Sequence, residues 1–378
     1  MAKRSTPRTA SRNMKERDAA TTKKIVELVT QVSRTALAGK EPQIEIPTRT
    51  KSNTLWNKKR GILEMGDGTA ARPLFDLKTA KQFMQTMLHS STIKDLIEAQ
   101  KTSSLRGVFY KAKHTVAGTR ENTFDTQDES DPILEDLEVA LGALREELHI
   151  FAENRGAMVG NITIVDKGDE IDCRRMGSGG YALPSIVEPD VIQFKKCEAK
   201  FVLHVEKGTV WNRFNEDRFW EKHNCILTHG AGQPPRGCRR LLQRLHQELK
   251  LPIICVLDAD PWGHYIYSVI KQGSISLAFE SSRLAIPDAK FLGIRAKDFR
   301  ECGLDDAVKI DLTENDIKRA NEIRAYPWFK DHRGWQKEID ALLKSGFKME
   351  VESLITKDIS YVSETYVPER LKKKDWLE

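Results

Sequence analysis

Arg106, Tyr110 and His114 recur at intervals of four positions in one short segment. If residues 105–114 are helical, this spacing places the three side chains on one helix face. A tyrosine hydroxyl has a pKa of about 10, and a neighbouring guanidinium favours the phenolate and binds phosphate. Nucleophilic attack on a phosphate is therefore chemically reasonable, although a tyrosine on a basic helix more commonly packs or contacts phosphate. For His114, a local hydrogen bond or surface position competes with a proton relay to Tyr110.

Three acidic residues close apolar runs that predict β-strands: Glu206 ends FVLHVE, and Asp258 and Asp260 end IICVLDAD. In an open parallel sheet, functional side chains gather at the carboxyl ends of the strands. Three carboxylates there repel one another unless a cation joins them, and magnesium needs only a few protein oxygens. The alternative is that these acids only cap the helices that follow. A Glu at one strand end and DxD at a later one resembles the Toprim fold of topoisomerases, bacterial-type primases and certain nucleases.

A third candidate site is the segment GAGQPPRGCRR, which precedes and opens a predicted helix over 236–250. Helix N-termini and guanidinium groups both suit backbone phosphates. We therefore expect DNA contact here, against the alternative of a solvated helix face. The candidate DNA-binding residues are Gln233, Arg236, Arg239 and Arg240.

The N-terminal part of the chain must position Tyr110. Residues 1–24 are basic and lack apolar periodicity, which predicts a disordered tail. Residues 25–70 contain one amphipathic helix and the alternating arm EPQIEIPTRT, which together predict a partner-binding element. Helical patterns over 78–88, 92–100 and 105–114, and a strong helix from Asp131-Pro132, predict a winged-helix domain over 71–155.

The rest of the chain must position the acids. Residues 156–195 are rich in glycine and turn signals and predict a β-rich connector. From 196 to 378, the apolar runs FVLHVE, CILTH, IICVLDAD and KFLGI alternate with helix-length segments, as in a mostly parallel α/β sheet. The expected fold class is therefore α/β with an α-rich, CAP-like winged-helix domain, followed by a Toprim domain with a C-terminal helical elaboration.

The composition of the chain indicates which partners and which cellular compartment to expect. The chain has 378 residues, 31% of them charged, with a net charge of +6, and residues 1–40 alone have ten Lys or Arg against three acids. A basic arm favours an anionic partner. The sequence has no secretory signal and no apolar run of membrane-spanning length, so we expect no membrane partner. Six scattered cysteines without a CxxC pair indicate free thiols in a reducing compartment.

Several segments are similar, in the same order, to blocks of the A subunit of topoisomerase VI and its meiotic double-strand-break relatives. They include TSSLRGVFYKAKH, FVLHVEKGTVWNRF, YVSETYVPERL and, most specifically, the stretch from GQPPR to DADPWG. The resemblance runs from about residue 25 to the C-terminus. It implies that Tyr110 attacks the DNA backbone with Arg106 one turn before it, and that Glu206, Asp258 and Asp260 hold magnesium.

The resemblance also implies partners: double-stranded DNA, a second copy in a homodimer that presents Tyr110 to the metal site of the other protomer, and a topoisomerase VI B-type ATPase subunit. Two A and two B subunits would form a heterotetramer. No GxxxxGK[ST] loop occurs in the sequence, so we expect no cofactor-binding residues for ATP in this chain. Two departures stand out, because Gly107 replaces the acid that usually follows the arginine and Ala259 replaces a common glycine.

The expected function is that of the DNA-cleaving A subunit of a type IIB ATP-dependent topoisomerase. It would make a transient double-strand break with 5′-phosphotyrosyl ends for duplex passage, relaxation and decatenation. Two alternatives stay open: a meiosis-type break protein of the same family, and a non-catalytic DNA-binding scaffold with the same fold. The expected location is the cytoplasm, associated with the nucleoid, or the nucleus if the host is eukaryotic.

Overall fold

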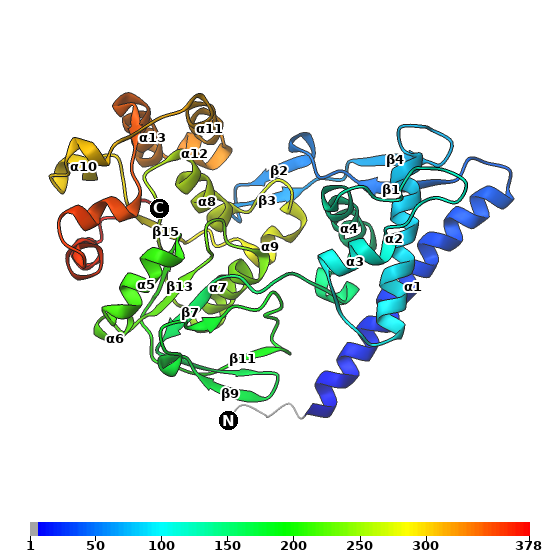
Figure 1. The fold of residues 1–378 in the computed structure, drawn as a ribbon, viewed down its shortest axis with the longest axis horizontal. Helices are drawn as coiled ribbons and strands as arrows, with labels where there is room; N and C mark the ends of the chain where they lie inside the picture. Colours follow the sequence, from blue (N-terminus) through cyan, green and yellow to red (C-terminus); the bar gives the residue numbers. More distant parts are fainter. Residues whose placement is uncertain (1–6) are drawn as a thin grey trace. The chain divides into compact units, whose positions relative to one another are not determined.

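The computed structural model describes residues 7–378, which divide into two compact units (Figure 1). The first unit contains the chain up to Thr54 together with Met65–Glu153, and the second contains Leu55–Glu64 and Asn154–Glu378. Each unit has a hydrophobic core of its own. Among residues 7–378, no helix combines the length and the apolar character needed to cross a membrane.

The first unit begins with the long helix α1 (Pro7–Leu37). The prediction of a disordered tail over 1–24 is therefore wrong for residues 7–24, while residues 1–6 lie outside the described residues. No proline follows Pro7 in this segment. Tertiary contacts also hold it, because Asp18 accepts a hydrogen bond from Gln100 at 2.8 Å and pairs with Nε2 of His149 at 3.0 Å. Such contacts order a segment that has no apolar periodicity.

The apolar residues after Lys24 pack inside the first unit. Ile25 is only 2% exposed and lies in a core with residues of α2 (Ala80–Glu98) and α4 (Gln127–Leu141). The predicted arm is strand β1 (Gln43–Pro47), which pairs antiparallel with β4 (Thr69–Pro73) and buries Ile44 and Ile46. These side chains are not free to bind another protein. The prediction that they form a partner-binding face is thus wrong for Ile25, Ile44 and Ile46.

Helices α2 and α4 both pack against α3 (Leu105–Ala112), the helix that contains Tyr110. Helix α2 is continuous where two helices were predicted, and α4 begins before Asp131-Pro132. Two short strands, β5 (Ser103–Ser104) and β6 (Ile150–Phe151), pair in parallel. Helix α3 is anchored by three buried residues, Val108, Phe109 and Ala112.

The second unit is built on a mixed six-stranded sheet in the order β10-β7-β13-β12-β14-β15. The four predicted strands are confirmed and run parallel, whereas β7 and β10 pair antiparallel at one edge. Their bounds are β7 (Ala157–Gly160), β10 (Tyr181–Ala182), β12 (Val202–Val205), β13 (Ile226–His229), β14 (Ile253–Val256) and β15 (Lys290–Gly293). Because β12 lies directly beside β14, the chain brings Glu206 next to the DxD segment.

Helices cover both faces of this sheet (Figure 1). One core joins the sheet to α7 (Arg236–Leu249), α8 (Pro261–Gln272) and α13 (Arg333–Ser345). The other joins it to α5 (Gly208–Glu216), α6 (Phe219–Lys222) and α14 (Val367–Lys373). Successive residues of a strand point to opposite faces, so Val202 packs in the first core and Leu203 in the second. This double cover explains the continuous apolar runs of the strands.

Residues 156–195, which were predicted to be a connector, contribute strands to two sheets. They supply β7 and β10 to the main sheet, and β8 (Ile162–Asp166) and β9 (Asp169–Asp172) to a three-stranded sheet completed by β11 (Ile192–Cys197). The second unit also contains further short strands and helices. They are β2 (Thr54–Asn57), β3 (Ile62–Met65), β16 (Ile310–Asp311), β17 (Phe347–Lys348), α9 (Ser281–Leu284), α10 (Asp298–Glu301), α11 (Glu314–Arg324) and α12 (Pro327–Asp331). Of these, α11 and α12 contribute residues to the first core.

Candidate functional site

Tyr110 is presented to solvent by a short, well-capped helix in the first unit. Ser104 is the N-cap of α3, and its hydroxyl accepts a hydrogen bond from the backbone N–H of Gly107 at 3.0 Å. With Val108 and Phe109 buried, the helix exposes its opposite face, and Tyr110 is 57% exposed. A phenol in this position is accessible to a macromolecular substrate.

Arg106 lies one turn before Tyr110 and beside its ring. Nη2 of Arg106 is 3.5 Å from the Tyr110 hydroxyl, and the guanidinium carbon is 5.6 Å from the ring centroid. The structure therefore brings together the predicted nucleophile and its arginine. A phosphate bound by Arg106 would meet the hydroxyl directly.

The structure adds to the sequence prediction at Gly107 on α3 and differs from it at His114, just after this helix. A Cβ atom on Gly107 would lie 2.4 Å from the Ser103 hydroxyl, so an acid at this position requires that hydroxyl to move. The helix ends at Ala112, and His114 lies beyond it, with its backbone N–H donating to Thr123 at 3.0 Å. The prediction that His114 continues the Tyr110 helix face is therefore wrong, because the chain turns before it.

The three acids all lie at the carboxyl ends of β12 and β14 in the second unit. Oε2 of Glu206 accepts a hydrogen bond from the backbone N–H of Asp258 at 3.2 Å. Burial, and next the charge of Asp258, raises the pKa of Glu206 to about 8. Burial likewise raises the pKa of Asp258 to about 6 and raises that of Asp260. Held together without a cation, these carboxylates resist ionisation.

Each aspartate also has a local partner. Oδ1 of Asp258 accepts the backbone N–H of Val351 at 2.8 Å, and Oδ2 lies 2.9 Å from Nζ of Lys207. Asp260 caps α8, where its Oδ1 accepts the backbone N–H of Gly263 at 2.5 Å. The capping role that competed with metal binding in the sequence analysis is thus real for Asp260.

The donor set suits a hard divalent cation in chemistry but is not preassembled. Within residues 7–378, no three His, Cys, Asp or Glu side chains are gathered closely enough to hold a metal ion. Glu206 and Asp258 offer buried carboxylates at one sheet edge, and an ion there would offset the cost of their burial. Asp260 would join them only by turning away from Gly263.

Sequence reasoning missed the basic residue and the two acids that complete this edge. Nζ of Lys207 lies 3.2 Å from both Glu350 and Glu352, besides its contact with Asp258. Burial opposes the charged form of Lys207, but its hydrogen bond to Asp258 and the nearby acidic charges raise its pKa. Lys207 directly follows Glu206, so its place beside the acids could have been predicted from the sequence. Glu350 and Glu352 come from a distant segment, and no local sequence pattern indicates that they contact Lys207.

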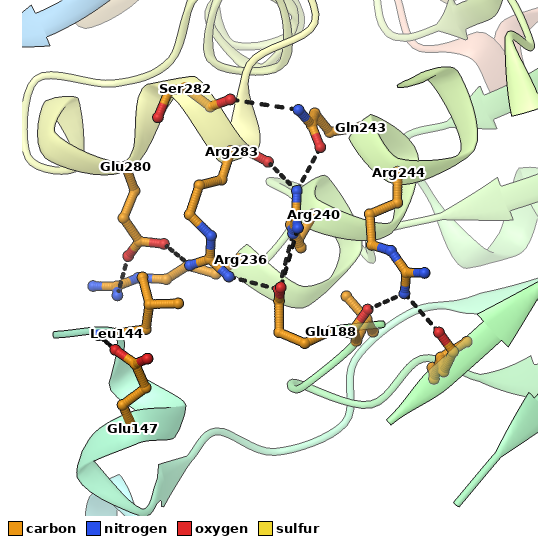
Figure 2. A network of polar contacts seen from close by, with 12 residues as sticks. Leu144, Glu147, Glu188, Arg236, Arg240, Gln243, Arg244, Glu280, Ser282 and Arg283 are labelled. Atoms are coloured by element: carbon orange, nitrogen blue, oxygen red, sulfur yellow. Dashed lines mark hydrogen bonds and ion pairs between the residues drawn. The ribbon is translucent and has the colours of Figure 1, made fainter. Parts of the chain in front are cut away.

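Arg236 and Arg240 of α7 belong to an internal ion-pair network (Figure 2). Arg236 pairs with Glu280 at 2.6 Å, and Arg240 pairs with Glu188 at 2.8 Å. Arg283 joins the two acids, at 2.7 Å from Glu280 and 2.5 Å from Glu188. Arg240 and Arg236 are therefore neutralised within the unit and do not form the open basic face expected from the sequence.

Arg239 is a clearer correction. It is 4% exposed, and its Nε and Nη1 atoms have no hydrogen-bond partner among the described residues. Burial lowers its pKa to about 10. A side chain enclosed in this way does not present its guanidinium to DNA, so the prediction of DNA contact is wrong for Arg239 in this structure. Gln233 lies outside this network, in the loop before α7.

Three family descriptions match consecutive parts of the chain. "Type IIB DNA topoisomerase" matches residues 81–150, which include Tyr110. "All-beta domain in DNA topoisomerase VI alpha subunit" matches residues 152–198. The Toprim domain shared by the A subunit of topoisomerase 6 and Spo11 matches residues 201–371, which include all three acids.

Curated proteins are similar over nearly the full chain. The A subunit of type 2 DNA topoisomerase 6 from Pyrococcus horikoshii is 41% identical over 360 residues, covering 93% of this chain and 94% of the relative. The protein of the same name from Hyperthermus butylicus is 41% identical over 371 residues, with 94% of each chain covered. The A subunit of DNA topoisomerase 6 from Arabidopsis thaliana is 32% identical over 350 residues, covering 93% of this chain and 80% of the relative.

Proposed function

The chain belongs to the family of topoisomerase VI A subunits, and from this premise we infer how its residues perform the DNA cleavage of a type IIB topoisomerase. The protein is the DNA-cleaving component of a DNA topoisomerase. The observation that carries the residue assignment is the exposed Tyr110 hydroxyl beside Arg106 in the part of the chain that matches the type IIB description.

Tyr110 is the nucleophile of this proposal. Its oxygen forms a bond to the phosphorus of a backbone phosphodiester and loses its proton, while the bond to the 3′ oxygen breaks. The 3′ oxygen takes up a proton, and the 5′ end stays linked to the tyrosine. One phosphodiester replaces another, so religation is the reverse step and needs no external energy. Arg106 binds the phosphate.

Magnesium is the cofactor that we propose for the acid edge of the sheet. Glu206 and Asp258 would hold it, with Asp260 as a third ligand once it releases its helix cap. When bound, the ion supplies positive charge to the phosphate and to the leaving oxygen. The raised pKa values of Glu206 and Asp258 support this assignment, because burial, and for Glu206 next the charge of Asp258, raises them, and a cation at the site would offset both effects.

We propose that the DNA substrate is double-stranded and contacts the first unit through a winged-helix domain. The packing of α3 against α2 and α4, with Tyr110 outward, supports this assignment. In the second unit, Gln233 and the entry to α7 at Arg236 remain candidate phosphate contacts, although Arg236 would have to share or leave Glu280.

The partners of the proposal are a second copy of the chain and a B-type ATPase subunit. A homodimer supplies two tyrosines, one for each strand of the duplex. The sequence has no nucleotide-binding GxxxxGK[ST] loop, so ATP would act through the B-type partner of a heterotetramer. We place the contact with this partner on the outward side of α1, where Val26 and Val29 are exposed while Ile25 packs inward. We propose that the protein acts where its DNA substrate lies, in the nucleoid or in a eukaryotic nucleus.

The proposal is tested with supercoiled plasmid, magnesium, ATP and a B-type subunit. The chain with its partner should relax the plasmid and, when stopped with denaturant, leave protein attached to 5′ ends. The chain without its partner should give no ATP-driven relaxation. Plasmid that stays supercoiled and free of attached protein under all of these conditions would contradict the proposal.

A further inference from the structure

A second lysine, Lys348, lies at the acid edge on the side of Asp260. Ala259 exchanges backbone hydrogen bonds with Met349 at 2.9 and 3.2 Å, which forms an antiparallel bridge just after β17. In such a bridge, the residue after one partner stands opposite the residue before the other. The backbone of Asp260 is extended, with φ −146° and ψ 167°, so the register places Asp260 opposite Lys348.

The alternation of side chains along this bridge directs Lys348 to the acid edge. The bridged pair itself is buried in the core that joins the sheet to α5, so the residues next to it point the other way. Asp258 and Glu350 do so together, because both contact the same ammonium group. Burial raises the pKa of Asp260, while the backbone hydrogen bond of Gly263 and then the charge of Lys348 oppose that rise. Lys348 therefore lies within electrostatic reach of Asp260.

A single carboxylate holds the ammonium of Lys348. Its Nζ lies 2.9 Å from Oδ2 of Asp316, which is its only ion pair within residues 7–378, and its side chain is 21% exposed. Asp316 is itself fixed, because it forms the capping box of α11 with Thr313. Its Oδ1 also accepts the indole N–H of Trp262 at 3.1 Å. An ammonium has three N–H donors, so Lys348 keeps donors for a further anion.

The other lysine of the acid edge is less suited to bind an anion. Lys207 contacts Asp258, Glu350 and Glu352, so its charge is matched by three carboxylates of the protein. Lys348 has one such partner and remains partly exposed. A phosphodiester that approaches this acidic edge needs positive charge beside it, and lysine is a common phosphate-binding side chain.

We propose that Lys348 is a phosphate-binding residue of the cleavage site, whose ammonium donates to a non-bridging oxygen of the scissile phosphodiester on the Asp260 side of the acid edge. The contact forms when DNA binds and strengthens as charge builds up on the phosphate during transesterification. This inference rests on the proposed function, because the scissile phosphate must bind at the acid edge. It adds the protein side chain that offsets the charge of that phosphate.

The test removes charge from the lysine and, separately, from the phosphate. Wild type and Lys348→Met, each with the B-type partner, are given a duplex oligonucleotide that contains a mapped cleavage site. On the ordinary duplex the variant should cleave roughly 10²-fold more slowly. On a duplex with a neutral methylphosphonate at both scissile positions, the two proteins should cleave at nearly equal rates, because no phosphate charge is left for Lys348 to offset.

Two further variants separate this contact from a structural role. Lys222→Met is the matched control, because it removes a lysine from an exposed pair with Glu364 and should leave both cleavage rates unchanged. The double variant Lys348→Met, Asp316→Asn avoids a buried carboxylate without its cation, so its free energy of unfolding should stay near that of the wild type. It should show the same loss of cleavage, on the ordinary duplex alone.

The outcomes separate the inference from the proposed function. A loss of equal size on both duplexes, or no loss on the ordinary duplex, overturns the inference and leaves the proposed function standing. An ordinary duplex that the wild type does not cleave overturns both. If neither protein cleaves the methylphosphonate duplex, binding affinities decide, and Lys348→Met should bind only the ordinary duplex more weakly than the wild type does. Equal weakening for both duplexes, or none, contradicts the inference.

Discussion

Oε2 of Glu206 accepts the backbone N–H of Asp258 at 3.2 Å, which joins the carboxyl ends of two neighbouring parallel strands. The contact places the first acid directly over the backbone of the second. It explains why residues so far apart in the sequence share one electrostatic environment, in which burial raises the pKa of both carboxyl groups. The shared electrostatic environment of these two acids therefore depends on the strand order, which places β12 beside β14.

Asp258→Asn tests the acid edge. The substitution keeps the shape of the side chain but removes charge from the ligand set, so DNA cleavage should fall by roughly 10²-fold or more. Magnesium affinity, measured by calorimetric titration, should fall as well. Equal magnesium affinity in the wild type and the variant would show that Asp258 does not hold the ion.

His264→Leu tests the buried histidine of α8. Burial lowers the pKa of His264 to about 4, so the folded state keeps the ring neutral while the unfolded state protonates at about 6.5. The ring therefore costs no stability through protonation above that pH, and it destabilises the fold increasingly as the pH falls towards 4. Between these values the free energy of unfolding of the wild type should drop by about 3 kcal/mol more than that of the variant. Urea unfolding at a series of pH values measures this difference, and parallel pH profiles would contradict it.

Arg239→Met tests whether the buried arginine is structural. Its guanidinium is enclosed, and two of its nitrogen atoms have no partner within residues 7–378, so an apolar side chain of similar length should leave the free energy of unfolding unchanged or raise it by about 1 to 3 kcal/mol. Affinity for duplex DNA should stay within twofold. A large loss of DNA affinity at unchanged stability would restore Arg239 as a DNA contact.

The partner surface is tested by the double substitution Val26→Asp and Val29→Asp. These side chains are 46% and 39% exposed, so the fold should survive while co-purification with a B-type subunit is lost. Ile25→Asp is the contrasting variant, because it buries a charge in the core and should unfold the first unit. Normal assembly of the double variant would place the partner elsewhere.

The strands and their acids could be predicted because their signals are local. Apolar runs such as FVLHVE must be buried on both faces, and the acids that end them fall at one edge once the strands are parallel. The position of Tyr110 on a short helix was likewise predictable, because Ser104 caps that helix and the apolar residues around Tyr110 define the buried side. Its role as the nucleophile is implied by the family resemblance and not by these local signals.

The missed features depend on contacts between distant segments. Residues 7–24 have no apolar period, and Asp18 becomes ordered through His149 and Gln100. Arg239 and Arg240 look alike in the sequence, but only the packed structure decides that one is enclosed and the other pairs with Glu188. The ion pairs of Lys207 were likewise not predictable, because Glu350 and Glu352 come from a distant segment of the chain.

The most direct measurement of the central claim is the identity of the residue that is linked to cut DNA. Cleavage reactions with the B-type partner are stopped with denaturant, digested with protease, and the peptide left on the 5′ ends is sequenced. The wild type and Tyr361→Phe should both give ends linked to Tyr110. Tyr110→Phe, which keeps the exposed ring but lacks the attacking oxygen, should bind DNA normally and give no linked ends. Protein-linked 5′ ends recovered from Tyr110→Phe would contradict the account.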